Sequence, residues 1–157
     1  MMENLFLSIE KLLKGKCAIV GIGSEIKGDD GVGSILISRL KGKTSAKLFD
    51  CAEVPENYIQ PIIKVRPDSI LIVDACDWAG SPGELKLVKN EELEQFGFST
   101  HNASLALFCG YLKQELPNLS IIILGIQIKG TGLMQPLSCE VKATLERLVE
   151  FFMRFQE

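Results

Sequence analysis

Short apolar runs, separated by stretches with helical periodicity, constrain the fold of this chain more than any other feature. Four runs, at 16–21, 46–51, 69–75 and 119–126, are mostly apolar and too short for buried helices. Runs of this kind are typical of strands that are covered on both faces of a sheet. They predict four strands of one sheet, mostly parallel.

The segments between these runs predict helices. Apolar residues recur at helical spacing in 2–13, 32–40, 55–65, 102–116 and 138–155. Strands that alternate with helices form a parallel sheet with helices on both of its faces. We therefore expect an α/β fold, a three-layer α/β/α sandwich of the phosphorylase/hydrolase-like type.

One further strand is expected to differ from the others. Leu85 and Leu87 alternate with Lys86 in the segment 84–88, a pattern typical of a half-exposed strand. We expect this strand to be antiparallel and near an edge, which makes the sheet five-stranded. A short helix is expected at 90–96.

Length and charge limit the class of protein. With 157 residues, the chain is expected to be a single domain spanning 1–157. The composition, with 46% hydrophobic and 24% charged residues, is typical of a globular protein. The net charge of −3 gives no indication of a basic surface for nucleic acid or an anionic membrane. No apolar run approaches the ~18 residues of a membrane-spanning helix. We expect a cytoplasmic monomer.

The amino-terminal segment and the cysteines agree with a cytoplasmic location. Glu3, Glu10 and Lys11 interrupt the apolar residues of 2–13, and no cleavage site follows, so this segment is expected to be a helix and not a signal peptide. The five cysteines have no paired spacing and stand mostly in or beside apolar runs. We expect reduced, buried thiols.

A glycine-rich loop with two adjacent carboxylates follows the first predicted strand. The stretch 20–33 holds five glycines around Asp29 and Asp30. The spacing after Gly23 does not fit a dinucleotide loop, and acidic residues stand where a phosphate loop needs a cation. Two carboxylates suit a metal ion or a proton transfer; the alternative is that Asp29 or Asp30 caps the next helix.

Other polar residues are expected at the same edge of the sheet. Asp30 follows the first strand, Asp74 ends the third, and Gln127 follows the last. Ligands of such sheets bind beyond the carboxyl ends of the strands, so these residues are expected to converge.

His101 is the only histidine, so any imidazole chemistry must use it. A helical zinc site with two imidazoles is excluded. Together with Asp30 and Asp74, His101 forms a set able to hold a divalent ion and leave coordination positions open. The alternative is that His101 is only a polar residue at the start of a helix, and that Thr100 or Asn102 caps this helix.

The loop also resembles a known family. Its pattern, G-x-G-[NS]-x-x-x-x-D-D-G-x-G, resembles the opening of the hydrogenase maturation endopeptidases of the type that processes the hydrogenase 3 large subunit. These enzymes remove a C-terminal extension from the large subunit of nickel-iron hydrogenases. Further similar segments follow in the order of the family at 71–75, 82–84, 100–102 and 125–127.

The resemblance implies a site and a substrate. The nickel-recognising residues of the family match Asp30, Asp74 and His101, which are therefore the expected catalytic and metal-binding residues. The nickel is expected to be supplied by the substrate, a large-subunit precursor that has already received it. Other divalent ions are expected to substitute for nickel in the free protein.

Several assignments remain open at this stage. The alternative function is a non-catalytic metal-binding protein or metallochaperone of hydrogenase assembly. A flavodoxin-like binder of a small cofactor would suit the fold class, but this chain lacks a phosphate loop. Asp29 is expected to bond nearby amides and hold Asp30 in position. Asp77 is interpreted as a turn residue and Cys76 as a buried thiol. The loop 130–136 is expected to help choose the partner.

Overall fold

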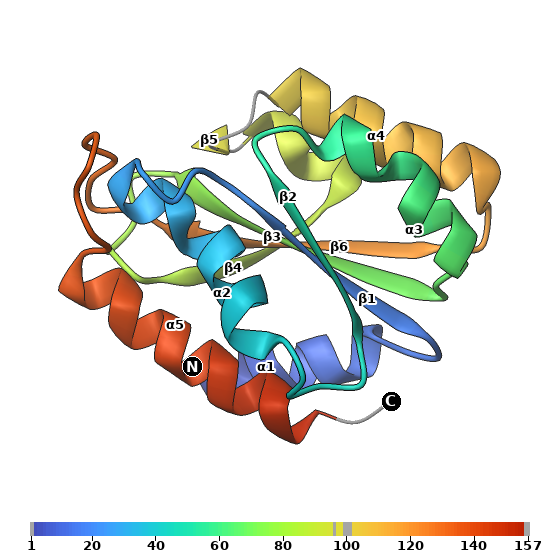
Figure 1. Cartoon of the computed structure of the whole chain (residues 1–157), viewed down its shortest axis with the longest axis horizontal. Helices are drawn as coiled ribbons and strands as arrows, with labels where there is room; N and C mark the ends of the chain where they lie inside the picture. The colour runs from blue at the N-terminus through green and yellow to red at the C-terminus, as the bar shows by residue number, and fades with distance from the viewer. Residues whose placement is uncertain (1, 96, 99–101, 156–157) are drawn as a thin grey trace.

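The computed structural model of the protein describes residues 2–95, 97–98 and 102–155. Its described part is built on one sheet whose five longest strands lie in the order β2, β1, β3, β6, β4 (Figure 1). Their bounds are β1 (Cys17–Ile22), β2 (Lys47–Ala52), β3 (Ser69–Asp77), β4 (Leu85–Lys89) and β6 (Ser120–Gln127). Strands β2, β1, β3 and β6 are parallel to one another, whereas β4 runs antiparallel to β6. A short strand, β5 (Gly97–Phe98), pairs antiparallel with the end of β3.

Helices cover both faces of the sheet (Figure 1). One face carries α1 (Met2–Leu12), α2 (Val32–Leu40) and α5 (Cys139–Arg154), and the other carries α3 (Ile59–Val65) and α4 (Asn102–Glu115). Three 3-10 turns, η1 (Gly28–Gly31), η2 (Pro55–Tyr58) and η3 (Asn90–Gln95), complete the described elements. The expected α/β/α sandwich with one antiparallel edge strand is confirmed.

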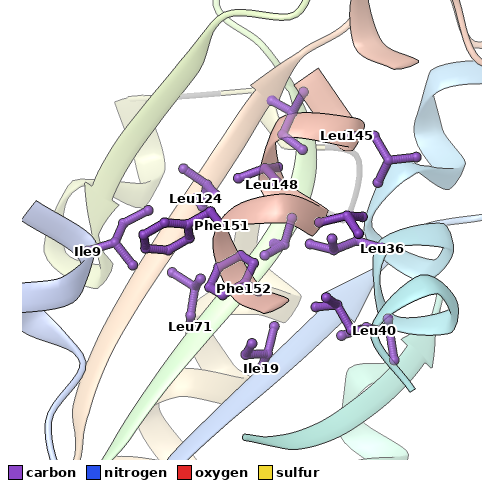
Figure 2. Packing of buried hydrophobic residues seen from close by; sticks show 14 of the residues in the cluster. Ile9, Ile19, Leu36, Leu40, Leu71, Leu124, Leu145, Leu148, Phe151 and Phe152 are labelled. Atoms are coloured by element: carbon purple, nitrogen blue, oxygen red, sulfur yellow. The ribbon is translucent and has the colours of Figure 1, made fainter. Parts of the chain in front are cut away.

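Alternation along the buried strands divides the core in two. In β3, Leu71 and Val73 join the cluster under α1, α2 and α5, whereas Ile70 and Ile72 join the cluster under α3 and α4. Figure 2 shows the first cluster, in which side chains of three helices meet those of three strands: Ile9, Ile19, Leu36, Leu40, Leu71, Leu124, Leu145, Leu148, Phe151 and Phe152. Burying each such side chain stabilises the fold by about 1.5–3 kcal/mol.

The predicted helix at 55–65 is only partly correct. It begins as the 3-10 turn η2 and becomes an α-helix only from Ile59. Pro61 has no N–H to donate to the carbonyl of Asn57, which removes an α-helical hydrogen bond at this junction. The predicted helix at 90–96 is likewise a 3-10 turn, η3, and its last expected residue lies outside the described part.

The expectation of buried thiols is wrong for one cysteine. Four cysteines are buried, but Cys139 is exposed because it is the first residue of α5, directly after the cap residue Ser138. All five are free thiols. Within the described residues, the helices are too short or too polar to cross a bilayer.

Candidate active site

Three loops meet at the carboxyl ends of the parallel strands. The segment after β1 carries Asp29 and Asp30, the segment after β3 leads to β4, and the segment after β6 leads to α5. Backbone hydrogen bonds join the first loop to the third, from Gly28 N to Gln135 O (3.1 Å) and from Asp29 N to Gly130 O (2.9 Å). Figure 1 shows these two loops, in light blue and dark orange, side by side.

Two glycines allow the acidic loop to fold tightly against the sheet. Gly23 has a φ of +144°, and a Cβ at this position would collide with the carbonyl oxygen of Asp30. Gly33, in the first turn of α2, lies against the carbonyls of Ile22 and Val73, where a Cβ would stand 2.6 Å from the latter oxygen. The start of α2 therefore packs directly on β1 and β3 because Gly33 has no side chain.

Asp30 is buried, and it does not cap a helix. The residue is 8% exposed, and its Oδ2 accepts a hydrogen bond from the amide of Ser24 at 3.0 Å. The cap residue of α2 is Gly31, with no side-chain cap bond, so the helix-capping alternative for Asp30 is wrong. Oδ1 has no hydrogen-bond partner among the described residues. One oxygen thus positions the side chain while the other stays available.

Asp74 lies inside β3, which continues for two residues beyond the predicted range 69–75. It is fully buried and pairs in register with Gly125 of β6. Alternation places it on the face covered by α3 and α4, together with Ile72 and Cys76. A buried carboxylate on an otherwise apolar sheet face needs a compensating interaction, and its place on this face makes Asp74 a functional candidate.

The Cys76 thiol is held in its neutral form in the metal-free protein. Burial, followed by the negative charge of Asp74, raises its pKa to about 12. The thiolate is the form that binds metals, and its population at neutral pH is negligible with such a pKa. The interpretation of Cys76 as a buried thiol is confirmed.

Asp29 connects the two loops. It is fully buried, and its carboxylate accepts hydrogen bonds from the amides of Lys129 (2.8 Å), Gly130 (3.1 Å) and Ser138 (2.7 Å) and from the Ser138 hydroxyl (2.9 Å). Ser138 in turn caps α5. Asp29 does bond amides as expected, but they come from the loop after β6 and not from its own neighbourhood.

Gln127 has a structural role. Its Oε1 accepts from the amides of Trp78 (3.0 Å) and Gly80 (3.1 Å), and its Nε2 donates to Asp77 Oδ1 and to the carbonyl of Ile128, both at 3.0 Å. These four bonds use the whole capacity of the amide. The bond from Gln127, with a second from the amide of Ala79, lowers the pKa of Asp77. Asp77 is the last residue of β3, and its side chain accepts from the amide of Ala79 in the turn that follows, so the interpretation as a turn residue is only partly correct.

The predicted triad is only partly within the described structure. Asp30 lies in η1 and Asp74 lies in β3, and these two elements contact each other. His101 and the alternative cap Thr100 lie outside the described residues, and α4 begins at Asn102. Among the residues that the structure describes, no three His, Cys, Asp or Glu side chains form a metal-binding group. The set of three therefore stays a prediction.

Comparison with known proteins identifies the family. The model of the HycI family, described as hydrogenase maturation protease, matches residues 32–154, a range that contains Asp74 and His101 and begins just after Asp30. The chain belongs to the hydrogenase maturation protease family.

Relatives and solved structures agree with this assignment. The protease is 32% identical to the hydrogenase 3 maturation protease of Escherichia coli (strain K12), over 82% of this chain and 83% of the relative. Its fold is similar to that of the HycI maturation protease of Thermococcus kodakarensis KOD1, with a TM-score of 0.83 and 31% identity over 93% and 96% of the two chains. The endopeptidase HycI of Escherichia coli gives a TM-score of 0.79 at 29% identity, over 88% and 90%.

The protease is thus an endopeptidase of hydrogenase maturation. This result decides against the alternative of a non-catalytic metal-binding protein.

Proposed function

We propose that this protease removes the C-terminal extension of a nickel-iron hydrogenase large-subunit precursor after nickel insertion, with the nickel of the precursor as the recognition element. The name of its relative from Escherichia coli, a hydrogenase 3 maturation protease, supports a hydrogenase precursor as the substrate. The cytoplasm is the proposed location, and a monomer the proposed state.

The observation that carries the proposal is a pair of buried carboxylates at one edge of the sheet. Asp74 is fully buried, and Asp30 directs one oxygen to the Ser24 amide and leaves the other available within the described residues. The available oxygen of Asp30 favours a cation, because a buried carboxylate oxygen without a donor is costly. With the imidazole of His101, the two carboxylates form a donor set that suits borderline divalent metals.

The roles of the three residues follow from their chemistry. Asp30 and Asp74 supply negative charge for the cation of the precursor, and His101 supplies a neutral nitrogen donor. A divalent ion that keeps open positions polarises a carbonyl or activates water. Because the ion arrives with the precursor, the protein contributes an incomplete set of donors, and this makes recognition depend on the metal state of the substrate.

The decisive experiment compares two forms of one precursor. The purified protease is incubated with the nickel-loaded precursor and with the same precursor before nickel insertion, and the products are measured by mass spectrometry. We expect one short C-terminal peptide from the first form and none from the second. Equal cleavage of both forms would contradict nickel recognition, and no cleavage of either folded form would contradict the choice of substrate.

Variants of the protease test the three residues. Asp30→Asn, Asp74→Asn and His101→Ala are each expected to slow cleavage about tenfold or more. Glu25→Gln is the matched control, because Glu25 is an exposed carboxylate in the same loop as Asp30. Calorimetry gives an independent measurement: weak binding of nickel, zinc or cadmium to the free protein should disappear in His101→Ala. Unchanged binding in that variant would remove His101 from the ligand set.

A further inference from the structure

Three exposed apolar side chains border the acidic loop. Ile26, Leu133 and Met134, here called the apolar rim, are 54%, 67% and 78% exposed. Leu133 and Met134 are the most exposed large hydrophobic side chains in the described part of the chain. Single exposed apolar residues are ordinary on protein surfaces, whereas a group of them at the margin of a site indicates binding.

The rim is fixed to the acidic loop by backbone hydrogen bonds. The amide of Met134 donates to the carbonyl of Ile26 at 2.6 Å, and the amide of Gly28 donates to the carbonyl of Gln135 at 3.1 Å. The buried carboxylate of Asp29 holds the beginning and the end of the same loop through its bonds to Gly130 and Ser138. The rim and the Asp30 loop therefore form one unit with a fixed geometry.

The backbone of Met134 is in an unfavourable conformation. Its φ is +64°, in the left-handed region, which costs a residue with a side chain roughly 1 kcal/mol or more. A glycine would adopt this conformation freely. The chain instead keeps an unbranched apolar side chain here and presents it to solvent. Strain of this kind, when the surrounding structure maintains it, is a reason to look for a function.

We propose that the apolar rim binds an apolar stretch of the precursor chain next to the bond that is cleaved, and so selects the substrate by sequence as well as by metal. This inference rests on the proposed function. It assigns the rim to substrate binding and leaves the chemistry to the residues of the site.

Size and position favour a polypeptide segment over a second copy of the protein. Three side chains expose on the order of a few hundred Å², well below the roughly 1,200 Å² of a small stable interface. Ile26 of the rim belongs to the loop that carries Asp30, so a precursor whose metal lies at Asp30 brings its chain close to the rim. The unbranched side chain of Met134 adapts to apolar segments of varied shape.

The test uses two substitutions that leave the fold intact. Met134→Gly removes the side chain and relieves the left-handed strain, so its stability should not fall. Leu133→Ser replaces a largely exposed apolar side chain by a small polar one. Leu107→Ser is the matched control, because Leu107 is 63% exposed on α4, on the opposite face of the sheet from α5. The substrate is the nickel-loaded large-subunit precursor.

We expect each rim variant to raise KM roughly tenfold with little change in kcat, since uniform binding is lost and the reacting groups are untouched. The affinity of each variant for the precursor, measured by calorimetry under conditions that stop cleavage, should fall by the same factor. Leu107→Ser should match the unmodified protein. Unchanged KM and affinity in both rim variants, or an equal loss in Leu107→Ser, would overturn the proposal.

The outcomes separate this proposal from the proposed function. If the protease binds the precursor without cutting it, the affinities still decide whether the rim takes part. If the unmodified protease neither binds nor cuts it, both proposals are wrong. If sedimentation shows a dimer that Met134→Gly dissociates, the rim binds a second copy and the proposal is overturned.

Discussion

Replacement of Asp29 by alanine should release the acidic loop from the loop after β6 and lower the stability of the protein. The substitution leaves three amides, those of Lys129, Gly130 and Ser138, without their acceptor. Each unsatisfied buried donor costs about 1–3 kcal/mol, and the low end applies here because the partner loop is close to solvent. We therefore expect a loss of about 3–5 kcal/mol, a large share of the ~5–15 kcal/mol of a typical domain.

Asparagine at this position should have an intermediate effect. Asp29→Asn keeps the shape and one acceptor oxygen, but its NH₂ group must face a donor, either the Ser138 amide on one side or the amides of Lys129 and Gly130 on the other. A loss of about 1–3 kcal/mol follows from one unsatisfied group and one lost charge-assisted bond.

Thermal unfolding followed by circular dichroism is the assay. At roughly 2–4 °C per kcal/mol for a chain of this size, Asp29→Ala should lower Tm by about 10 °C and Asp29→Asn by less. Glu25→Ala is the control, because Glu25 is exposed in the same loop and its loss should change stability by no more than about 0.5 kcal/mol. A Tm of Asp29→Ala within 2 °C of the control would refute the reasoning that these hydrogen bonds hold the two loops together.

Three further results are expected. Gly33→Ala should destabilise by about 1–3 kcal/mol in urea unfolding, whereas Gly110→Ala, on α4 with open space around it, should stabilise by up to about 1 kcal/mol; equal effects would contradict the close packing of α2. A maleimide at pH 7 should label Cys139 within minutes and leave Cys76, with its pKa of about 12, unlabelled until the protein unfolds, as peptide mapping by mass spectrometry would show. The pKa of Asp77 is lowered in the folded state, so its ionised carboxylate contributes to stability at neutral pH, and this contribution is lost as the pH falls through that pKa. The Tm of Asp77→Asn should therefore lie below that of the unmodified protein at pH 7, and the difference should shrink at pH 3. A constant difference would refute this.

The sheet was predictable because strand signals in this chain are local. Residues 69–75 are an almost unbroken apolar run, and that property alone identifies a strand buried on both faces. Alternation around Lys86 predicted the antiparallel edge strand in the same way. The break in the helix predicted at 55–65 also had a local signal, Pro61. Proline has no N–H, and this interrupts the hydrogen bonds along the helix.

The site was predictable only in part because its contacts are not local. Residue type and strand position were sufficient to select Asp30 and Asp74. The partners of Asp29 are backbone amides of Lys129, Gly130 and Ser138, and a backbone amide has no signature in the sequence. The exposure of Leu133 and Met134 was equally hidden, since apolar residues are ordinarily assigned to the core.

The hydrogen bonds of Asp29 also determine when the acidic loop can form during synthesis. Lys129 stands 100 positions after Asp29 and Ser138 stands 109 positions after it. At ~5–20 residues per second, a ribosome makes these partners roughly 5–20 s after it makes the carboxylate. During that interval the residues of β1 and α2 have been made, but the carboxylate of Asp29 has none of the donors that hold it. A growing chain therefore carries an unassembled acidic loop, and this loop acquires its folded geometry only when the segment leading into α5 has left the ribosome.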